Sequence, residues 1–168
     1  MNSITFQTRT RFGKIGELLV MLEFLKLGIN GVIIGGQNLK HAPDLLLENG
    51  IGIEVKTSLY IEQRFPGTWN TGIKKGGWAF AEIKRSNSAI LAFVLLNLDF
   101  SVYKILYSSP SDFNSTSWNY RKPTELHLKQ NRRGPKSKET LIPSFMEENL
   151  ERYLKIHFGS MPSDTAGQ

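Results

Sequence analysis

The chain has 168 residues, of which 40% are hydrophobic and 21% charged, so it has the size and composition of one globular domain and is not a wholly disordered chain. It has no cysteine, which excludes a disulfide framework, a Cys-type zinc site and a thiol nucleophile. Lys and Arg number 21 against 15 Asp and Glu, and this formal charge of +6 indicates a polyanionic partner, most often nucleic acid.

The first predicted element is a helix over residues 11–27. Apolar residues recur at helical spacing on two opposite sides, which predicts a helix buried on nearly all sides. One side carries Val20, Met21 and Phe24 together with Glu17. A carboxylate in such a setting is costly unless it is paired or bound to a metal. The other side carries Phe12, Ile15, Leu18, Leu19, Leu22 and Leu25.

A hairpin is the clearest signal that follows the helix. A short strand is expected over residues 31–35, and two more, 44–48 and 51–57, flank the turn dipeptide Asn49-Gly50. Three further strands are expected, the first of which would also suit a short helix: 78–84, 90–98 and 102–107. Asp99 and Phe100 would form the last turn.

The C-terminal part begins with residues 108–141, where regular pattern is lost. A closing helix is then predicted over 144–158, because Ser144 is followed three residues later by Glu147 in the capping-box arrangement. The whole chain, residues 1–168, is therefore expected to form a single α/β domain. It would have a core over about 11–107, a mainly antiparallel or mixed sheet, a basic loop region and a helix near each end.

Three charged residues carry the chemistry that the sequence suggests. Glu54 and Lys56 are two apart on a predicted strand and so share one face, and Asp44 lies on the partner strand of the hairpin. Two carboxylates beside an ammonium suit a divalent cation held by oxygen ligands. The lysine would orient or deprotonate a water, or stabilise charge on a phosphate.

The register of the hairpin tests this arrangement. With a two-residue loop at Asn49-Gly50, Asp44 and Glu54 would lie on different faces of the hairpin, because a shift of one residue moves every side chain to the other face. A three-residue loop over 49–51, or an equivalent bulge, would place Asp44 opposite Lys56 and on the face of Glu54. The alternative interpretation of the three charges is a cross-strand ion-pair cluster without catalytic function.

The order of these residues resembles the PD-(D/E)xK nuclease superfamily, which includes restriction enzymes, Holliday junction resolvases and some homing endonucleases. The resemblance rests on Gly13-Lys14-Ile15-Gly16-Glu17, then Pro43-Asp44, then Glu54-Val55-Lys56-Thr57-Ser58, and covers roughly residues 11–107. It implies that Asp44, Glu54 and Glu17 hold Mg²⁺ or Mn²⁺ and that Lys56 is the family lysine. The implied activity is hydrolysis of DNA phosphodiester bonds, with one or two cations neutralising developing charge.

A basic segment lies towards the C-terminus. Residues 121–138 include seven basic residues and only one acidic residue, so the positive charge of the chain is concentrated there. Such segments follow phosphate backbones, although a solvated loop is the plain alternative. Lys74 and Lys75, in a Gly-rich loop, are a second predicted phosphate contact. The seven predicted DNA-binding residues of the segment are Arg121, Lys122, Lys129, Arg132, Arg133, Lys136 and Lys138.

The function expected from the sequence is a metal-dependent endonuclease that cuts duplex DNA at a specific sequence. A Holliday junction resolvase is the second candidate, and a non-catalytic DNA-binding module and a membrane-surface protein are the alternatives from other classes. Cutting both strands favours a homodimer or higher oligomer, for which the closing helix could serve as the contact face. No apolar run is long enough to span a bilayer and no signal peptide is evident, so a soluble cytoplasmic protein without membrane partners is expected.

Overall fold

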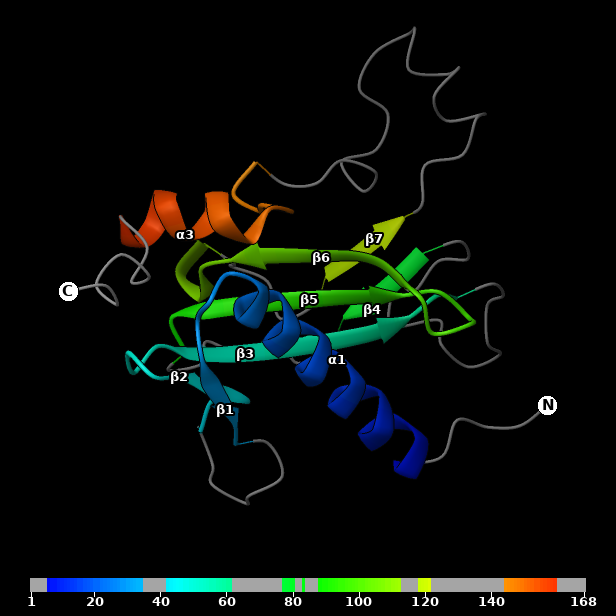
Figure 1. Ribbon diagram of the computed structural model, residues 1–168. Helices are drawn as coiled ribbons and strands as arrows, with labels where there is room; N and C mark the ends of the chain where they lie inside the picture. The colour runs from blue at the N-terminus through cyan, green and yellow to red at the C-terminus, as the bar shows by residue number, and fades with distance from the viewer. Residues whose placement is uncertain are drawn as a thin grey trace, which may run out of the picture.

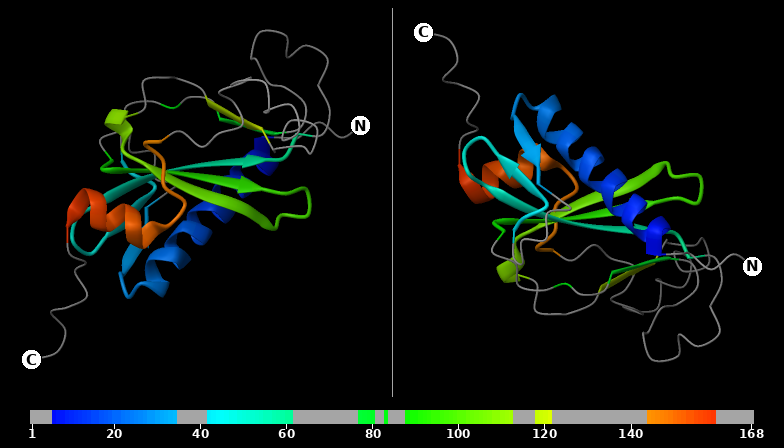
Figure 2. Two further views of the ribbon diagram at one scale, coloured as in Figure 1. Left: turned by 90° about the horizontal axis from the view of Figure 1, so that it is seen from above. Right: turned by 90° about the horizontal axis from the view of Figure 1, so that it is seen from below.

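The computed structural model describes residues 6–34, 42–61, 77–80, 83, 88–112, 118–121 and 144–159. These residues form a mixed α/β arrangement in which a sheet is covered by helices on one face and by a second, smaller sheet on the other (Figure 1, Figure 2). The helices are α1 (Phe6–Lys26) and α3 (Leu150–Phe158). None of the described helices is both long and apolar enough to cross a membrane.

The main sheet has five strands in the order β1-β2-β3-β5-β6. β3 and β5 are parallel and the other neighbouring pairs are antiparallel, so the prediction of a mixed sheet is confirmed. The smaller sheet pairs β4 with β7 in antiparallel orientation. The strands are β1 (Gly31–Ile33), β2 (Leu45–Leu47), β3 (Gly52–Leu59), β4 (Gly77–Phe80), β5 (Ile90–Leu96), β6 (Val102–Ser108) and β7 (Trp118–Arg121).

Helix α1 packs on the sheet through one side only. Val20 and Phe24 are fully buried in the apolar layer that α1 and α3 form against the sheet. The prediction that α1 is buried on nearly all sides is wrong, because α1 lies on the outside of β3 with no described element beyond it (Figure 2). Its outer side exposes Leu18, Leu22 and Leu25, each close to half exposed or more.

The opposite face of the sheet is covered by aromatic residues of β4 and β7. Trp78 and Phe80 pack against β5 and are buried in the core. Trp118 and Tyr120 were expected in a loop, and that prediction is wrong: both lie on β7 and join this core cluster. Trp118 stacks on Phe80 with ring centroids 5.5 Å apart, and this contact stabilises the pairing of β7 with β4, which the local sequence does not predict.

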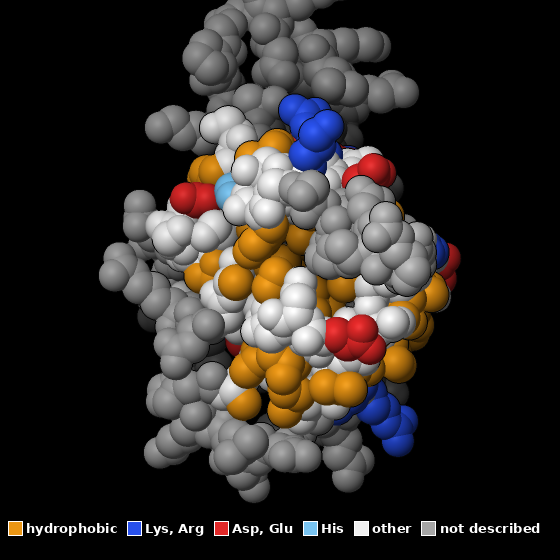
Figure 3. Space-filling view, turned by 60° about the vertical axis from the view of Figure 1, so that its left-hand side comes forward, with side chains coloured by type: hydrophobic (Ala, Val, Ile, Leu, Met, Phe, Trp, Pro, Cys, Tyr) orange, Lys and Arg blue, Asp and Glu red, His pale blue; other side chains and the backbone are white. Residues whose placement is uncertain are grey.

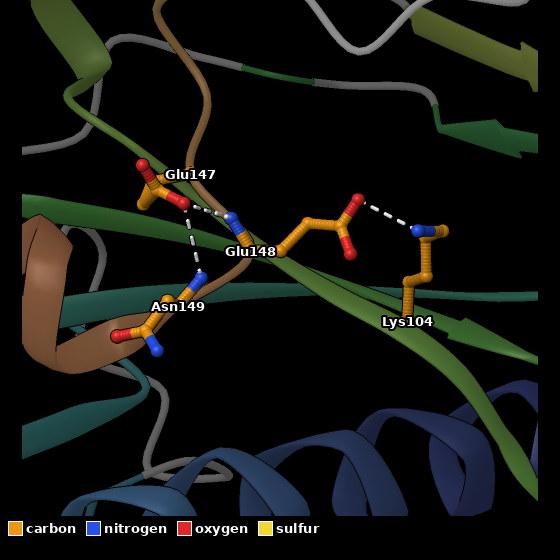
Figure 4. Close-up of polar contacts among 4 residues, drawn as sticks. All are labelled: Lys104, Glu147, Glu148 and Asn149. Atoms are coloured by element: carbon orange, nitrogen blue, oxygen red, sulfur yellow. Dashed lines mark hydrogen bonds and ion pairs between the residues drawn. The ribbon is translucent and has the colours of Figure 1, made fainter.

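The closing helix is shorter than predicted. It begins at Leu150, and its N-cap is Asn149, whose Oδ1 accepts a 2.8 Å hydrogen bond from the backbone N–H of Arg152. The Ser144 cap is therefore wrong. Glu147 pairs with the backbone of Tyr107 on β6, and its carboxylate accepts from the N–H groups of residues 148 and 149 (Figure 4). This pairing ties the segment before α3 to the edge strand β6 at Glu147, between a turn at residues 144–145 and the start of the helix.

Candidate active site

The β2–β3 hairpin sets the position of Asp44. Leu45 pairs with Ile53, and the loop has three residues, 48–50, with a turn closed by a hydrogen bond from Gly50 N–H to the Leu47 carbonyl. Gly50 has φ +82°, so the turn is a three-residue loop ending in a glycine bulge instead of the two-residue turn that Asn49-Gly50 favours. The odd loop length that the site requires is therefore present, shifted by one residue from the predicted 49–51. Continued by one residue, this register places Asp44 opposite Glu54 instead of opposite Lys56, and on the same face.

Asp44 lies just before the first residue of β2, beside the part of β3 that extends beyond β2. Its Oδ2 accepts a 2.8 Å hydrogen bond from the backbone N–H of Val55, which satisfies a strand donor that has no β2 partner there. Pro43 packs against Gly52, since a Cβ at residue 52 would lie 3.0 Å from the Pro43 Cβ. The Pro-Asp pair is therefore fixed by two contacts with β3.

The environment of Asp44 disfavours its negative charge. Burial raises the pKa of Asp44 to about 6, the Val55 hydrogen bond opposes this increase, and the charges of Glu54 and Glu17 add to it. Lys56 lowers the pKa to a smaller extent. The carboxylates of Glu17 and Glu54 and the ammonium of Lys56 therefore all influence the charge of Asp44. They come from α1 and β3, whereas Asp44 itself lies just before β2.

Glu54 and Lys56 form an ion pair on β3. The Lys56 Nζ lies 2.7 Å from the Glu54 Oε1, and their side chains are 24% and 19% exposed. Ile53 and Val55 point to the other face of the sheet, into the apolar layer beneath α1, as the alternation predicts. The pair is therefore held on a rigid strand yet reachable from solvent.

Glu17 reaches this region from α1, and its side chain is largely buried. Lys14, one turn earlier, places its Nζ 2.7 Å from the Glu17 Oε2. The helix approaches β3 closely at Gly16, where a Cβ would lie only 1.8 Å from the Thr57 Oγ1. Only glycine allows this approach, which brings α1 and Glu17 up to the edge of β3.

Sequence reasoning did not assign roles to Lys14, Gly16 and Thr57. A signal was present, because two glycines three residues apart inside a helix, Gly13 and Gly16, are unfavourable unless another backbone comes close. Nothing lies within 4 Å of a Cβ built at residue 13, so the close approach involves residue 16 alone.

The donor set has the chemistry of a site for a hard divalent cation. All three carboxylates offer oxygen, and burial together with the neighbouring carboxylates disfavours the negative charge of Asp44 and so raises its pKa. No three acidic or histidine side chains among the described residues lie close enough together to coordinate one ion. Glu17 and Glu54 each turn to a lysine, so ion binding would require these two side chains to rotate towards Asp44. The residue types therefore suit a divalent cation, and β3 provides a rigid strand that anchors the site.

Most of the predicted DNA-binding residues lie outside the described part of the chain. This holds for Lys74, Lys75, Lys122, Lys129, Arg132, Arg133, Lys136 and Lys138. The backbone of Arg121 ends β7, where it pairs with Gly77 of β4. Their contacts with DNA stay a prediction.

The fold is similar to a known nuclease structure. No family model matches the sequence, and no curated protein matches it. Among solved structures, the chain is similar to a bacterial homing endonuclease, I-Ssp6803I, with a TM-score of 0.55 and 13% sequence identity. The match covers 91% of this chain and 94% of that one. The similarity extends over nearly the whole length of both proteins and shows that they share a fold.

Proposed function

We propose that the protein is a divalent-metal-dependent DNA endonuclease with a PD-(D/E)xK type of site. The observation that carries the proposal is the hydrogen bond from the Val55 N–H to the Asp44 carboxylate, which sets Asp44 against β3 between the paired Glu54 and Lys56. The fold shared with a homing endonuclease supports the same chemistry.

In this proposal Asp44, Glu54 and Glu17 hold Mg²⁺ or Mn²⁺ through their carboxylate oxygens. A bound cation of this kind neutralises charge that develops on the phosphate and lowers the pKa of water. Asp44 is held in place by its hydrogen bond to β3, so it needs little reorganisation. Lys56 is close enough to the site to orient a water or to stabilise a phosphate oxygen.

Among the possible DNA substrates, we propose duplex DNA cut at a specific sequence, with a four-way junction as the second candidate. The whole-length similarity to a homing endonuclease favours the first. A non-catalytic DNA-binding module would need the three charges only as an ion-pair cluster. The burial of Asp44 beside two further carboxylates, which raises its pKa to about 6, does not favour that alternative, because a structural cluster is most stable when like charges are kept apart.

Two copies are proposed to act together, because cutting both strands of a duplex is commonly done by a symmetric pair. Leu18, Leu22 and Leu25 follow one another at intervals of four and three residues along the outer side of α1, and all are exposed. Figure 3 shows hydrophobic side chains gathered on one face of the molecule. We propose the α1 stripe as a contact surface beside the closing helix, which exposes Ile156 and Phe158.

The direct test is cleavage of plasmid DNA by the purified protein with Mg²⁺ present. The proposal expects cleavage by the wild type, none with EDTA, and a loss of about a hundred-fold or more in Asp44→Ala, the size of effect that one stabilising group contributes to catalysis. Asp99→Ala is the matched control, since Asp99 lies in the exposed β5–β6 turn, and it should cleave as the wild type does. Equal cleavage by all three proteins would reveal a contaminant and refute the proposal.

A further inference from the structure

A buried hydroxyl on β3 has no hydrogen-bond partner among the described residues. It is the Oγ1 of Thr57, the residue that follows Lys56 in the strand. A buried polar atom without a partner lowers stability, because it has lost its contacts with water and has gained no hydrogen bond in return. Such an atom in a folded protein calls for an explanation, and one explanation is a partner that it gains only when a ligand binds.

The Thr57 hydroxyl lies against α1 next to Glu17. A Cβ at residue 16 would lie 1.8 Å from the Thr57 Oγ1, so the hydroxyl occupies the place that a side chain at residue 16 would take. The backbone carbonyls in the middle of α1 accept hydrogen bonds within the helix. Of the two residues beside Gly16, Ile15 is apolar and Glu17 carries a carboxylate. Glu17 is therefore the acceptor that this part of α1 offers to Thr57.

The Glu17 carboxylate has a different donor in the structure. Its Oε2 accepts a 2.7 Å hydrogen bond from the Lys14 Nζ, and the charge of Glu17 contributes to the raised pKa of Asp44. A carboxylate has two oxygens and about four acceptor positions. Glu17 can therefore accept a hydrogen bond from Thr57 whether or not its pair with Lys14 persists.

We propose that Thr57 is a positioning residue of the cation site, whose hydroxyl donates to the Glu17 carboxylate once Glu17 turns towards Asp44. This inference rests on the proposed function. A donor behind a carboxylate ligand fixes the orientation of that ligand, and loss of such a donor weakens metal binding. The Thr57 hydroxyl thus destabilises the cation-free protein and stabilises the cation-bound one, so its removal should have opposite effects on two measurements.

The test compares two substitutions of Thr57 in the full chain. Thr57→Val removes the hydroxyl and keeps a branched side chain, so in EDTA its Tm should rise by roughly 2–4 °C. Its affinity for Ca²⁺, which prefers the same oxygen ligands and is titrated by calorimetry, should fall by about ten-fold. Thr57→Ser keeps the hydroxyl and should bind Ca²⁺ within about two-fold of the wild type.

Tyr107→Phe is the matched control. Tyr107 is buried on β6, and its hydroxyl also has no partner among the described residues. β5 lies between β6 and the site strand β3. Removal of the Tyr107 hydroxyl should therefore raise the Tm in EDTA as Thr57→Val does, and should leave the affinity for Ca²⁺ unchanged.

Three results would overturn the inference while cleavage of DNA by the wild type stays intact. They are a Tm of Thr57→Val in EDTA that does not rise, an unchanged affinity of Thr57→Val for Ca²⁺, and an equal loss of affinity in Thr57→Ser. If the wild type neither binds Ca²⁺ nor cleaves DNA, the proposed function fails as well.

Discussion

The close approach of α1 to β3 predicts opposite stability effects for two glycine-to-alanine substitutions on the same helix. At residue 16 a new Cβ would lie 1.8 Å from the Thr57 Oγ1 and 3.0 Å from the Thr57 Cβ. Rotation of Thr57 can move its Oγ1 but not its Cβ, so α1 must move by a few tenths of an ångström. Overpacking of this kind costs ~1–3 kcal/mol, and alanine returns up to about 1 kcal/mol of helix propensity.

Gly16→Ala should therefore lower the free energy of unfolding by about 1–2 kcal/mol, or Tm by roughly 2–8 °C for a domain of this size. Gly13→Ala, with open space around its new Cβ, should raise the free energy by about 0.5–1 kcal/mol. Urea unfolding followed by circular dichroism measures both. In a Thr57→Ala background, Gly16→Ala should cost less, as a double-mutant cycle reveals. If both glycine substitutions stabilise the protein equally, α1 does not approach β3 at Thr57.

The remaining predictions concern charge, capping and self-association. The folded-state pKa of Asp44, about 6, lies above its ordinary value of 3.8, so stability in EDTA should fall as pH rises between these values, and Asp44→Asn should flatten that decrease in pH-dependent unfolding curves. Asn149→Ala should cost about 1 kcal/mol in urea unfolding, whereas Ser144→Ala should change stability by less than about 0.5 kcal/mol; the reverse order would restore the predicted capping box. Leu22→Gln should weaken self-association, so that sedimentation velocity shows a smaller sedimentation coefficient than for the wild type. An unchanged coefficient would exclude the α1 stripe as the contact between copies.

The sequence predicts the elements that have strong periodicity and local turn chemistry. α1, the β2–β3 hairpin and the β5–β6 hairpin all form near their predicted positions. The alternation along β3 correctly assigns Glu54 and Lys56 to one face and Val55 to the other, because the side-chain period of a strand does not depend on its neighbours.

Other features depend on long-range contacts that local patterns do not contain. The hairpin loop has three residues because the pairing of β2 with β3 leaves Gly50 in a left-handed conformation. The helix near the C-terminus starts at Leu150, with Asn149 as its N-cap, because Glu147 pairs with Tyr107, more than thirty residues earlier in the chain. β7 forms because Trp118 stacks on Phe80 of β4. Glu147 and Tyr107 lie far apart in sequence, as do Trp118 and Phe80, so tertiary packing overrides the local preference in these two cases.

The proposed function requires Asp44 and Glu54, together with Glu17, to bind a divalent cation beside β3. The most direct measurement is anomalous diffraction from crystals soaked in Mn²⁺, repeated with Asp44→Ala crystals. We expect an anomalous peak within bonding distance of the Asp44 and Glu54 carboxylates in the wild type, and none in the variant. An active protein whose crystals show no peak near these side chains, or a peak that persists in Asp44→Ala, would contradict it.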